Sequence, residues 1–301
     1  MPIRSNRKTE TYYDQFSTSG DVAQSPYPWI FPFGDRALFL GGFGGTPQQD
    51  RNDIGYVNIT TTGDAADFGS LLAANKAIQG CSNAERGIVG GGSDSPNNII
   101  QYNTIATLGN SIDFGDLTHA TALSGGCASN TRGLITGDYP STGNDIDYIT
   151  IASTGNGTDF GNMTISVYNG RALSNQTRGL HCGGHTPTGQ NTIGYVTIAS
   201  TGDAVDFGDI SYDNVWGLAT CASPTRGFMY GGYDGSNNHN NIEYVTIATT
   251  GNATDFGDAS YNLGSHAAAG SPTRAVFAGG GASPAPLTNS MDFVEILTTG
   301  N

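Results

Sequence analysis

The chain has 301 residues, 45 glycines and a formal net charge of −14. Its glycines follow no Gly-X-Y period, which excludes a collagen-like protein, and no apolar run is long enough for a membrane helix. The first ten residues lack the apolar segment of a signal peptide, so we expect neither classical secretion nor membrane insertion. Because little positive charge remains to contact phosphates, we also expect no nucleic-acid partner for the body of the chain.

The N-terminal tail, residues 1–10, is locally basic in an otherwise acidic chain, with Arg4, Arg7 and Lys8. We predict that it anchors a single domain formed by residues 11–301. Residues 11–16 form a strand-like run without a nearby partner, and residues 29–33 form a second one just ahead of the first repeat.

From residue 36 the sequence repeats with a period of about 48 residues, which is typical of propellers and solenoids. Each copy has one repeat arginine: Arg36, Arg86, Arg132, Arg178, Arg226 and Arg274. A glycine doublet follows five residues later in every copy except the third, where Gly137 is followed by Asp138. An aromatic residue then begins an alternating run: Tyr56, Tyr102, Tyr148, Tyr195, Tyr244 and Phe293. Eleven residues further on, the first five copies carry Asp-Phe-Gly, beginning at Asp67, Asp113, Asp159, Asp206 and Asp255.

Each copy predicts four short strands, which we name a to d. Strand a is rich in small residues, as in residues 122–128, and a tight turn leads from it to strand b, as in residues 227–230. Strand c alternates with period two over residues 195–200, and strand d carries Asp-Phe-Gly. Helical periodicity is absent. The sequence therefore predicts an all-β, six-bladed β-propeller of four-stranded antiparallel blades, with strand a innermost.

The sixth copy ends too early to contain a strand d, because eleven residues after Phe293 would exceed the 301 residues of the chain. An unpaired sheet edge favours aggregation, and ring closure removes it. We therefore predict that residues 11–17 supply strand d of the last blade. Both chain ends would then leave from the face formed by the a–b and c–d turns, which we call the uniform face.

The recurring polar residues have structural interpretations. We expect the repeat arginines to pair with the Asp-Phe-Gly aspartates and so join strands or blades. Cys81, Cys127 and Cys221 share a repeat position with apolar residues, which indicates buried thiols without special chemistry. The segment from His181 to His185 includes Cys182, yet strand geometry separates these side chains and no carboxylate stands nearby. We predict no metal, no cofactor and no catalytic residue.

The b–c loops vary in length and the d–a segments vary in composition, and antiparallel strands put both on one face, which we call the variable face. Loops on a rigid scaffold are where recognition usually resides. Candidate ligand residues there are Tyr168, Tyr212, Trp216, Tyr261 and His239. The alternatives stay open that the aromatic residues pack under the loops and that the Asn-rich loop around His239 is a solvated turn.

The order of apolar strand, glycine doublet and aromatic-led strand resembles the kelch repeat over residues 36–301, with a phenylalanine in place of the usual outer-strand tryptophan. The phrase Tyr-Val-Thr-Ile-Ala-Ser-Thr-Gly at residues 195–202, followed by Asp-Phe-Gly-Asp, is similar to repeats in structural proteins of tailed bacteriophages, especially those that infect cyanobacteria. This resemblance implies a virion component, made in the host cytoplasm: a capsid decoration, a neck, or a tail or fibre protein for host attachment. Its partners would be other capsid or tail proteins and a host surface glycan, and a homo-oligomer formed through assembly stays open.

We therefore predict a non-enzymatic structural or binding propeller of a virion, anchored by its tail and its uniform face. A stand-alone glycan-binding, lectin-like propeller is the alternative. A kelch-like oxidase or a sialidase is the third hypothesis. Against it, the sequence lacks sialidase Asp-boxes and has no Tyr/His set with the spacing of a copper site.

Overall fold

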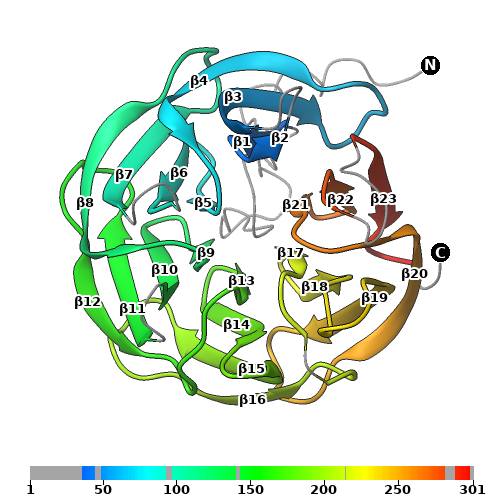
Figure 1. The fold of residues 1–301 in the computed structure, drawn as a ribbon. Helices are drawn as coiled ribbons and strands as arrows, with labels where there is room; N and C mark the ends of the chain where they lie inside the picture. The colour runs from blue at the N-terminus through cyan, green and yellow to red at the C-terminus, as the bar shows by residue number, and fades with distance from the viewer. Residues whose placement is uncertain are drawn as a thin grey trace, which may run out of the picture.

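A computed structural model of the chain describes residues 36–44, 49–92, 97–139, 143–213, 215–281 and 289–298. These residues form strands and turns with no helix, and the strands form six antiparallel sheets placed as blades around a central axis (Figure 1). The protein is an all-β, six-bladed β-propeller, which confirms the predicted fold.

Four consecutive blades have all four strands within the described residues, ordered a, b, c, d along each sheet. Blade 2 contains β5 (Gln79–Ser82), β6 (Arg86–Gly90), β7 (Asn97–Thr104) and β8 (Ile112–Thr121). Blade 3 contains β9 (Gly125–Ala128), β10 (Arg132–Asp138), β11 (Gly143–Thr150) and β12 (Thr158–Asn162). Blade 4 contains β13 (Arg171–Ser174), β14 (Arg178–His185), β15 (Gly189–Thr197) and β16 (Val205–Asp209). Blade 5 contains β17 (Ala219–Ala222), β18 (Arg226–Tyr230), β19 (His239–Thr246) and β20 (Thr254–Leu263).

The first and last blades meet where the ring closes. Blade 1 contains β1 (Arg36–Leu40), β2 (Phe43–Gly44), β3 (Gln49–Asn58) and β4 (Ala66–Asn75), where β2 continues the pairing of β1 with β3. Blade 6 contains β21 (Ala267–Gly270), β22 (Arg274–Ala278) and β23 (Met291–Glu295). The predicted closing strand at residues 11–17, the run at 29–33 and the basic tail with Arg4, Arg7 and Lys8 lie outside the described residues.

The boundaries of strand c differ from the prediction. Tyr195 was expected at the head of its strand, but β15 begins six residues earlier, at Gly189, and ends at Thr197. The polar residues ahead of Tyr195 pair through their backbones with β14 and β16, which needs no apolar side chain. Ile198 follows the end of β15 and keeps the alternation, because its side chain is fully buried. Its amide donates to Thr177 O in the a–b turn.

The core lies between neighbouring blades. Each cluster of buried side chains combines residues of two blades, such as Phe207 of blade 4 with Met229 of blade 5. The phenylalanine of each Asp-Phe-Gly is buried and packs edge-on against the strand-c tyrosine of its own blade, with ring centroids 5.8–6.2 Å apart. Ala37 and Val276 belong to one cluster that spans blades 1 and 6, so the apolar packing also closes the ring. All four cysteines are buried, which confirms the prediction for Cys81, Cys127 and Cys221.

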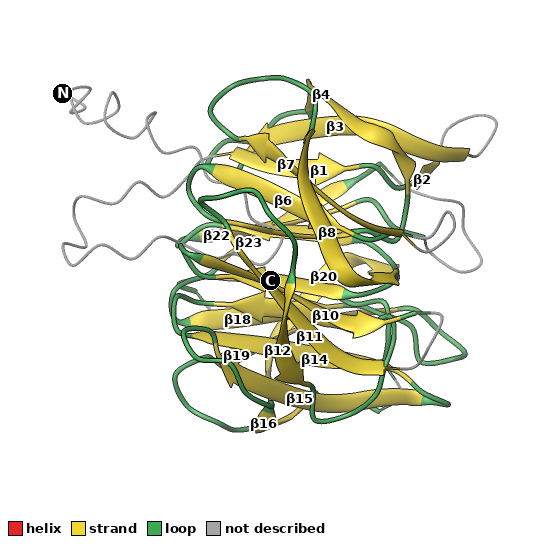
Figure 2. Ribbon diagram, turned by 90° about the vertical axis from the view of Figure 1, so that its left-hand side faces the viewer, coloured by secondary structure: helices red, strands yellow, loops and turns green. Residues whose placement is uncertain are grey.

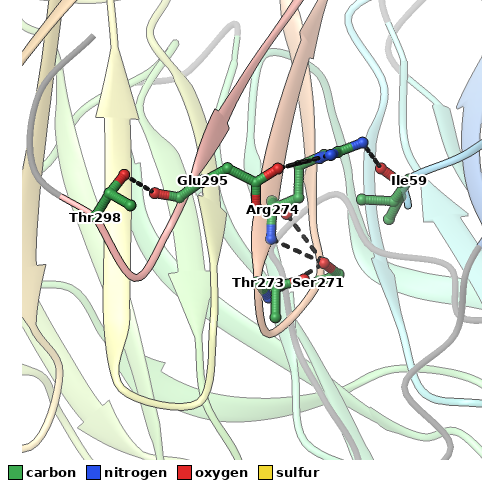
Figure 3. Close-up of polar contacts among 6 residues, drawn as sticks. All are labelled: Ile59, Ser271, Thr273, Arg274, Glu295 and Thr298. Atoms are coloured by element: carbon green, nitrogen blue, oxygen red, sulfur yellow. Dashed lines mark hydrogen bonds and ion pairs between the residues drawn. The ribbon is translucent and has the colours of Figure 1, made fainter. Parts of the chain in front are cut away.

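The repeat arginines join each blade to the next, but through partners that the sequence did not indicate. Each guanidinium lies over the strand-c aromatic ring of its own blade, at 4.2–4.7 Å from the ring centroid. Its Nη1 donates to the carbonyl of a buried isoleucine in the c–d turn of the following blade: Ile105, Ile151, Ile198, Ile247, Ile296 and Ile59. The predicted partners, the Asp-Phe-Gly aspartates, are instead exposed to solvent. The last bond, from Arg274 to Ile59, joins blade 6 to blade 1 (Figure 3).

The glycine of Asp-Phe-Gly is required by a close approach between blades. Gly208 has φ +149, and a Cβ there would lie 2.5 Å from the carbonyl oxygen of Gly251 in the next blade. The Gly251 amide donates to Phe207 O at 2.7 Å, so this contact is part of the bonding between blades. Gly69, Gly115 and Gly161 meet the next blade in the same way.

Candidate functional site

Each face of the ring carries the two kinds of connection that the sequence predicts for it. On the variable face, d–a residues pair with b–c residues through isolated backbone bridges, such as Tyr168 with His185 and Trp216 with Tyr233. On the uniform face, the c–d turn of each complete blade bonds to its own a–b turn. Figure 2 shows the blades from the side, with their connections at the two edges of the ring.

A chain of backbone hydrogen bonds runs around the axis on the variable face. It joins one d–a residue from each of five blades, nine positions before the repeat arginine: Ala77, Leu123, Asn169, Gly217 and Ser265. From Leu123 onward, each amide donates to the carbonyl of the preceding residue in this set, which gives four hydrogen bonds of 2.7–3.1 Å. All five residues have positive φ, between 52° and 67°, although only one is glycine. Because residues other than glycine rarely adopt this conformation, the chain of hydrogen bonds must hold the four others in place.

Next to this chain of hydrogen bonds, five side chains form a continuous row that we call the aromatic ladder: Tyr139, Tyr168, His185, Trp216 and Tyr233. Successive ring centroids are 5.4, 5.2, 4.5 and 5.1 Å apart. The rings meet at tilted or edge-on angles, and each is exposed or half-buried. The ladder crosses blades 3, 4 and 5 on the variable face.

The ladder has a sequence signal that the analysis of d–a segments alone missed. Tyr168 and Trp216, two of the predicted ligand residues, stand ten positions before their repeat arginines. The three missed members stand seven positions after theirs, in the b–c connections: Tyr139, His185 and Tyr233. The backbone bridges place these two repeat positions side by side within a blade. Aromatic residues aligned at both positions in consecutive repeats would have indicated the ladder.

The other predicted ligand residues lie elsewhere. Tyr212 packs against the core between blades 4 and 5 and donates its hydroxyl to Gly231 O, and burial raises its pKa. Its ring contacts His239, whose Nε2 lies 2.9 Å from Asp234 Oδ2. Tyr261 lies on strand d of blade 5 and is 49% exposed, apart from the ladder. The structure therefore brings two of the five candidates together in the ladder and two in a separate Tyr212–His239 pair.

A central cavity of about 1280 Å³ opens beside the ladder. Its lining includes three ladder side chains, Tyr139, Trp216 and Tyr233, and the first residues of several innermost strands. The charged residues among its described lining are all basic: Arg51, Lys76 and Arg171. Two buried histidines lie close to Arg171, and burial lowers the pKa of His181 to about 4 and that of His266 to about 3. Both imidazoles are therefore neutral at pH 7.

The segment from His181 to His185 has separate roles. His181 is buried, with Nε2 3.0 Å from Gly183 O and Nδ1 3.2 Å from Thr136 Oγ1, while His185 belongs to the ladder. Cys182 points into the core, and burial raises the pKa of its thiol to about 12. Across the described residues, no three His, Cys, Asp or Glu side chains gather in a way that would hold a metal ion.

No family model matches this sequence, and a search of curated proteins found no match either. Within the described part of the chain, no helix has the length and apolar character needed to span a membrane. The fold therefore classifies the chain as a propeller-repeat protein. A propeller fits a non-enzymatic binding or structural role.

Proposed function

We propose that this protein is a non-enzymatic binding propeller that attaches to saccharides through the aromatic ladder of its variable face. The ladder is the observation that carries the proposal. Aromatic side chains that lie outside a core present an apolar face together with a polar edge, which suits the alternating C–H and hydroxyl surfaces of sugar rings. Five such rings in one row, beside an open cavity, provide an extended surface of this kind.

The ladder is distinct from the packing that stabilises the fold. None of its five side chains belongs to the buried clusters between blades, whereas Tyr212, on the same face, does. Neither Trp216 nor Tyr233 is demanded by the repeat, because blade 6 has Gly264 and Gly281 at the same two positions and keeps the same backbone bridge. These aromatic residues therefore exceed what the scaffold needs.

The proposal includes no catalytic step. Catalysis by side chains needs a nucleophile or base, an acid and an electrophilic stabiliser that converge on one point. The ladder itself holds one imidazole, that of His185, together with an indole and three phenols, and none of its five side chains is a carboxylate or a thiol. Binding, without turnover, is what this surface supports.

We further propose that the propeller is a component of a virus particle that infects bacteria, where saccharide attachment would serve adhesion to the host surface. The repeat wording at residues 195–202 and in Asp-Phe-Gly-Asp supports this placement, through its similarity to repeats of phage structural proteins. Other capsid or tail proteins would hold the uniform face and the basic tail. The alternative, a stand-alone lectin-like propeller, keeps the same ligand surface without a particle.

A glycan array followed by titration of the best glycan tests the ligand surface. We expect Trp216→Ala to weaken binding by about 2 kcal/mol, which is roughly thirtyfold, because buried aromatic anchors dominate such interfaces. Tyr261→Ala is the matched control, since it removes an exposed aromatic ring that lies off the ladder. No glycan bound at millimolar concentration, or equal losses in the two variants, would reject the proposal.

Deletion of residues 1–10 tests the particle. If the tail anchors the propeller, the shortened protein keeps glycan binding but fails to enter assembled particles. Normal incorporation without the tail contradicts the anchoring role and favours the stand-alone lectin.

A further inference from the structure

The basic residues of this chain are unevenly placed. Of the twelve, six are the repeat arginines and three lie in the tail at residues 1–10. The remaining three, Arg51, Lys76 and Arg171, all line the central cavity. The described lining contains no aspartate or glutamate, although the chain has 26 acidic residues. The cavity is therefore a basic site in an acidic protein.

Only one of the three cations lacks a carboxylate partner within the described residues. Arg51 is paired with Asp53, and Lys76 Nζ lies 2.8 Å from Asp50 Oδ1. Arg171 instead donates through Nη1 to two neutral acceptors, Asn169 Oδ1 at 3.1 Å and Gly170 O at 2.9 Å. These bonds leave Nε and Nη2 of its guanidinium for another acceptor.

The repeat does not require an arginine at this position. Arg171 begins β13, an innermost strand, seven residues before the repeat arginine of its blade. The equivalent residues of the other described blades are Gln79, Gly125, Ala219 and Ala267. A cation surrounded by protein is costly unless a negative group compensates it, and burial already lowers the pKa of Arg171 to about 10. It remains charged at pH 7 and favours an anion beside it.

His266 supplies a second unused donor in the same cavity. The residue is 6% exposed, both ring nitrogens are buried, and neither has a hydrogen-bond partner among the described residues. The ring is held edge-on against Tyr230, with centroids 4.3 Å apart. Burial, together with the charge of Arg171, lowers the pKa of the imidazole and keeps it neutral, so it offers one N–H. A buried, unpartnered N–H is itself unfavourable, and a ligand acceptor would relieve this cost.

We propose that the central cavity binds a carboxylate or phosphate group, with the Arg171 guanidinium and a ring N–H of His266 as its donors. The site adjoins the ladder, because Asn169, which Arg171 contacts, directly follows Tyr168 in the chain. Trp216 and Tyr233 line the same cavity as Arg171 and His266. The further step, that the saccharide on the ladder is an acidic one, rests on the proposed function.

Calorimetric titration of the full chain with three probes tests the site: inorganic phosphate, an oligogalacturonide and the neutral galactose oligomer of equal length. We expect Arg171→Ala to weaken binding of phosphate and of the oligogalacturonide at least tenfold, since it removes charge-assisted hydrogen bonds, and to leave the neutral oligomer within twofold. Arg51→Ala is the control, because it removes a cavity cation that is already paired. Alanine occupies the Arg171 position in blades 5 and 6, and Arg171→Gln, which copies blade 2, is a second variant should the first fail to fold.

The outcomes separate this site from the proposed function. Phosphate and oligogalacturonide binding that both persist in the Arg171 variants, or that the wild type lacks, would overturn the anion site whatever the ladder does. Phosphate binding that depends on Arg171, without binding of either oligomer, would support the anion site and contradict saccharide attachment. Oligomer binding lost in Trp216→Ala but unchanged in Arg171→Ala would support the ladder and overturn the acidic ligand.

Discussion

Substitution of Arg274 by alanine tests how the ring is closed. The guanidinium of Arg274 joins blade 6 to blade 1, through a 3.1 Å hydrogen bond from Nη1 to Ile59 O, and lies 4.2 Å from the centroid of Phe293. A hydrogen bond from a charged donor contributes about 1.5–3 kcal/mol, and a cation over an aromatic ring contributes about 0.5–1 kcal/mol at a partly exposed site. The ion pair with Glu295 adds little, because that carboxylate is 46% exposed. We therefore expect Arg274→Ala to lower the free energy of unfolding by about 2–4 kcal/mol.

Urea unfolding followed by tyrosine and tryptophan fluorescence measures this loss. Arg51→Ala is the matched control, since its ion pair with Asp53 is exposed on both sides and should contribute within about 0.5 kcal/mol. Arg274→Lys should recover only part of the loss, because an ammonium group cannot both stack on the ring and reach the carbonyl in the same way. A loss in Arg274→Ala no larger than that in Arg51→Ala would refute the reasoning.

Three further predictions concern backbone and pH. Gly69→Ala should lower the free energy of unfolding by about 2 kcal/mol or more, because the added Cβ would lie 2.3 Å from Gly109 O. Gly109→Ala is the control and should be tolerated, because a Cβ there meets open space. Equal denaturation midpoints for the two variants would contradict this. Ser265→Gly should stabilise by about 0.5–1 kcal/mol, since φ is +55 there, while Ser260→Gly in a strand should destabilise; calorimetry that finds the same sign for both would refute it. His266 has a folded-state pKa near 3, below its unfolded value, so the stability that its neutral form contributes is present above about pH 6.5 and is lost as the pH falls toward 3. In His266→Phe, the slope of the free energy of unfolding against pH over this range should fall by up to about 1.4 kcal/mol per pH unit. Urea unfolding at several pH values measures this slope, and an unchanged slope would contradict the assignment.

The blades, their number and the two faces could be predicted from the sequence alone. Each repeat is a local unit in which the four strands follow one another closely and pair with their sequence neighbours, so the repeat positions report directly on the pairing. The grouping of the variable b–c and d–a connections follows from antiparallel alternation. The closing strand at residues 11–17 stays a prediction, since it lies outside the described residues.

Contacts between blades required the tertiary structure. The repeat arginines reach carbonyl groups of the next blade, 65–72 residues away along the chain within blades 1–6, and 215 residues away at ring closure. A backbone carbonyl has no sequence signature, so the sequence indicated the aspartates as partners. Tyr139, His185 and Tyr233 do share a repeat position, seven residues after the repeat arginine, but they lie in the b–c connections, whereas the predicted aromatic candidates came from the d–a segments.

The sequence by itself therefore determined the repeating unit, because strand pairing and turns are local and recur with the period. Only the tertiary structure decided which side chains meet around the axis: the ladder on three blades and Arg171, the one cavity cation without a carboxylate partner among the described residues. The physical reason is that these sites arise from residues that depart from the repeat. Whether these residues meet depends on the angle and distance between blades, which the closed ring sets and no single repeat encodes.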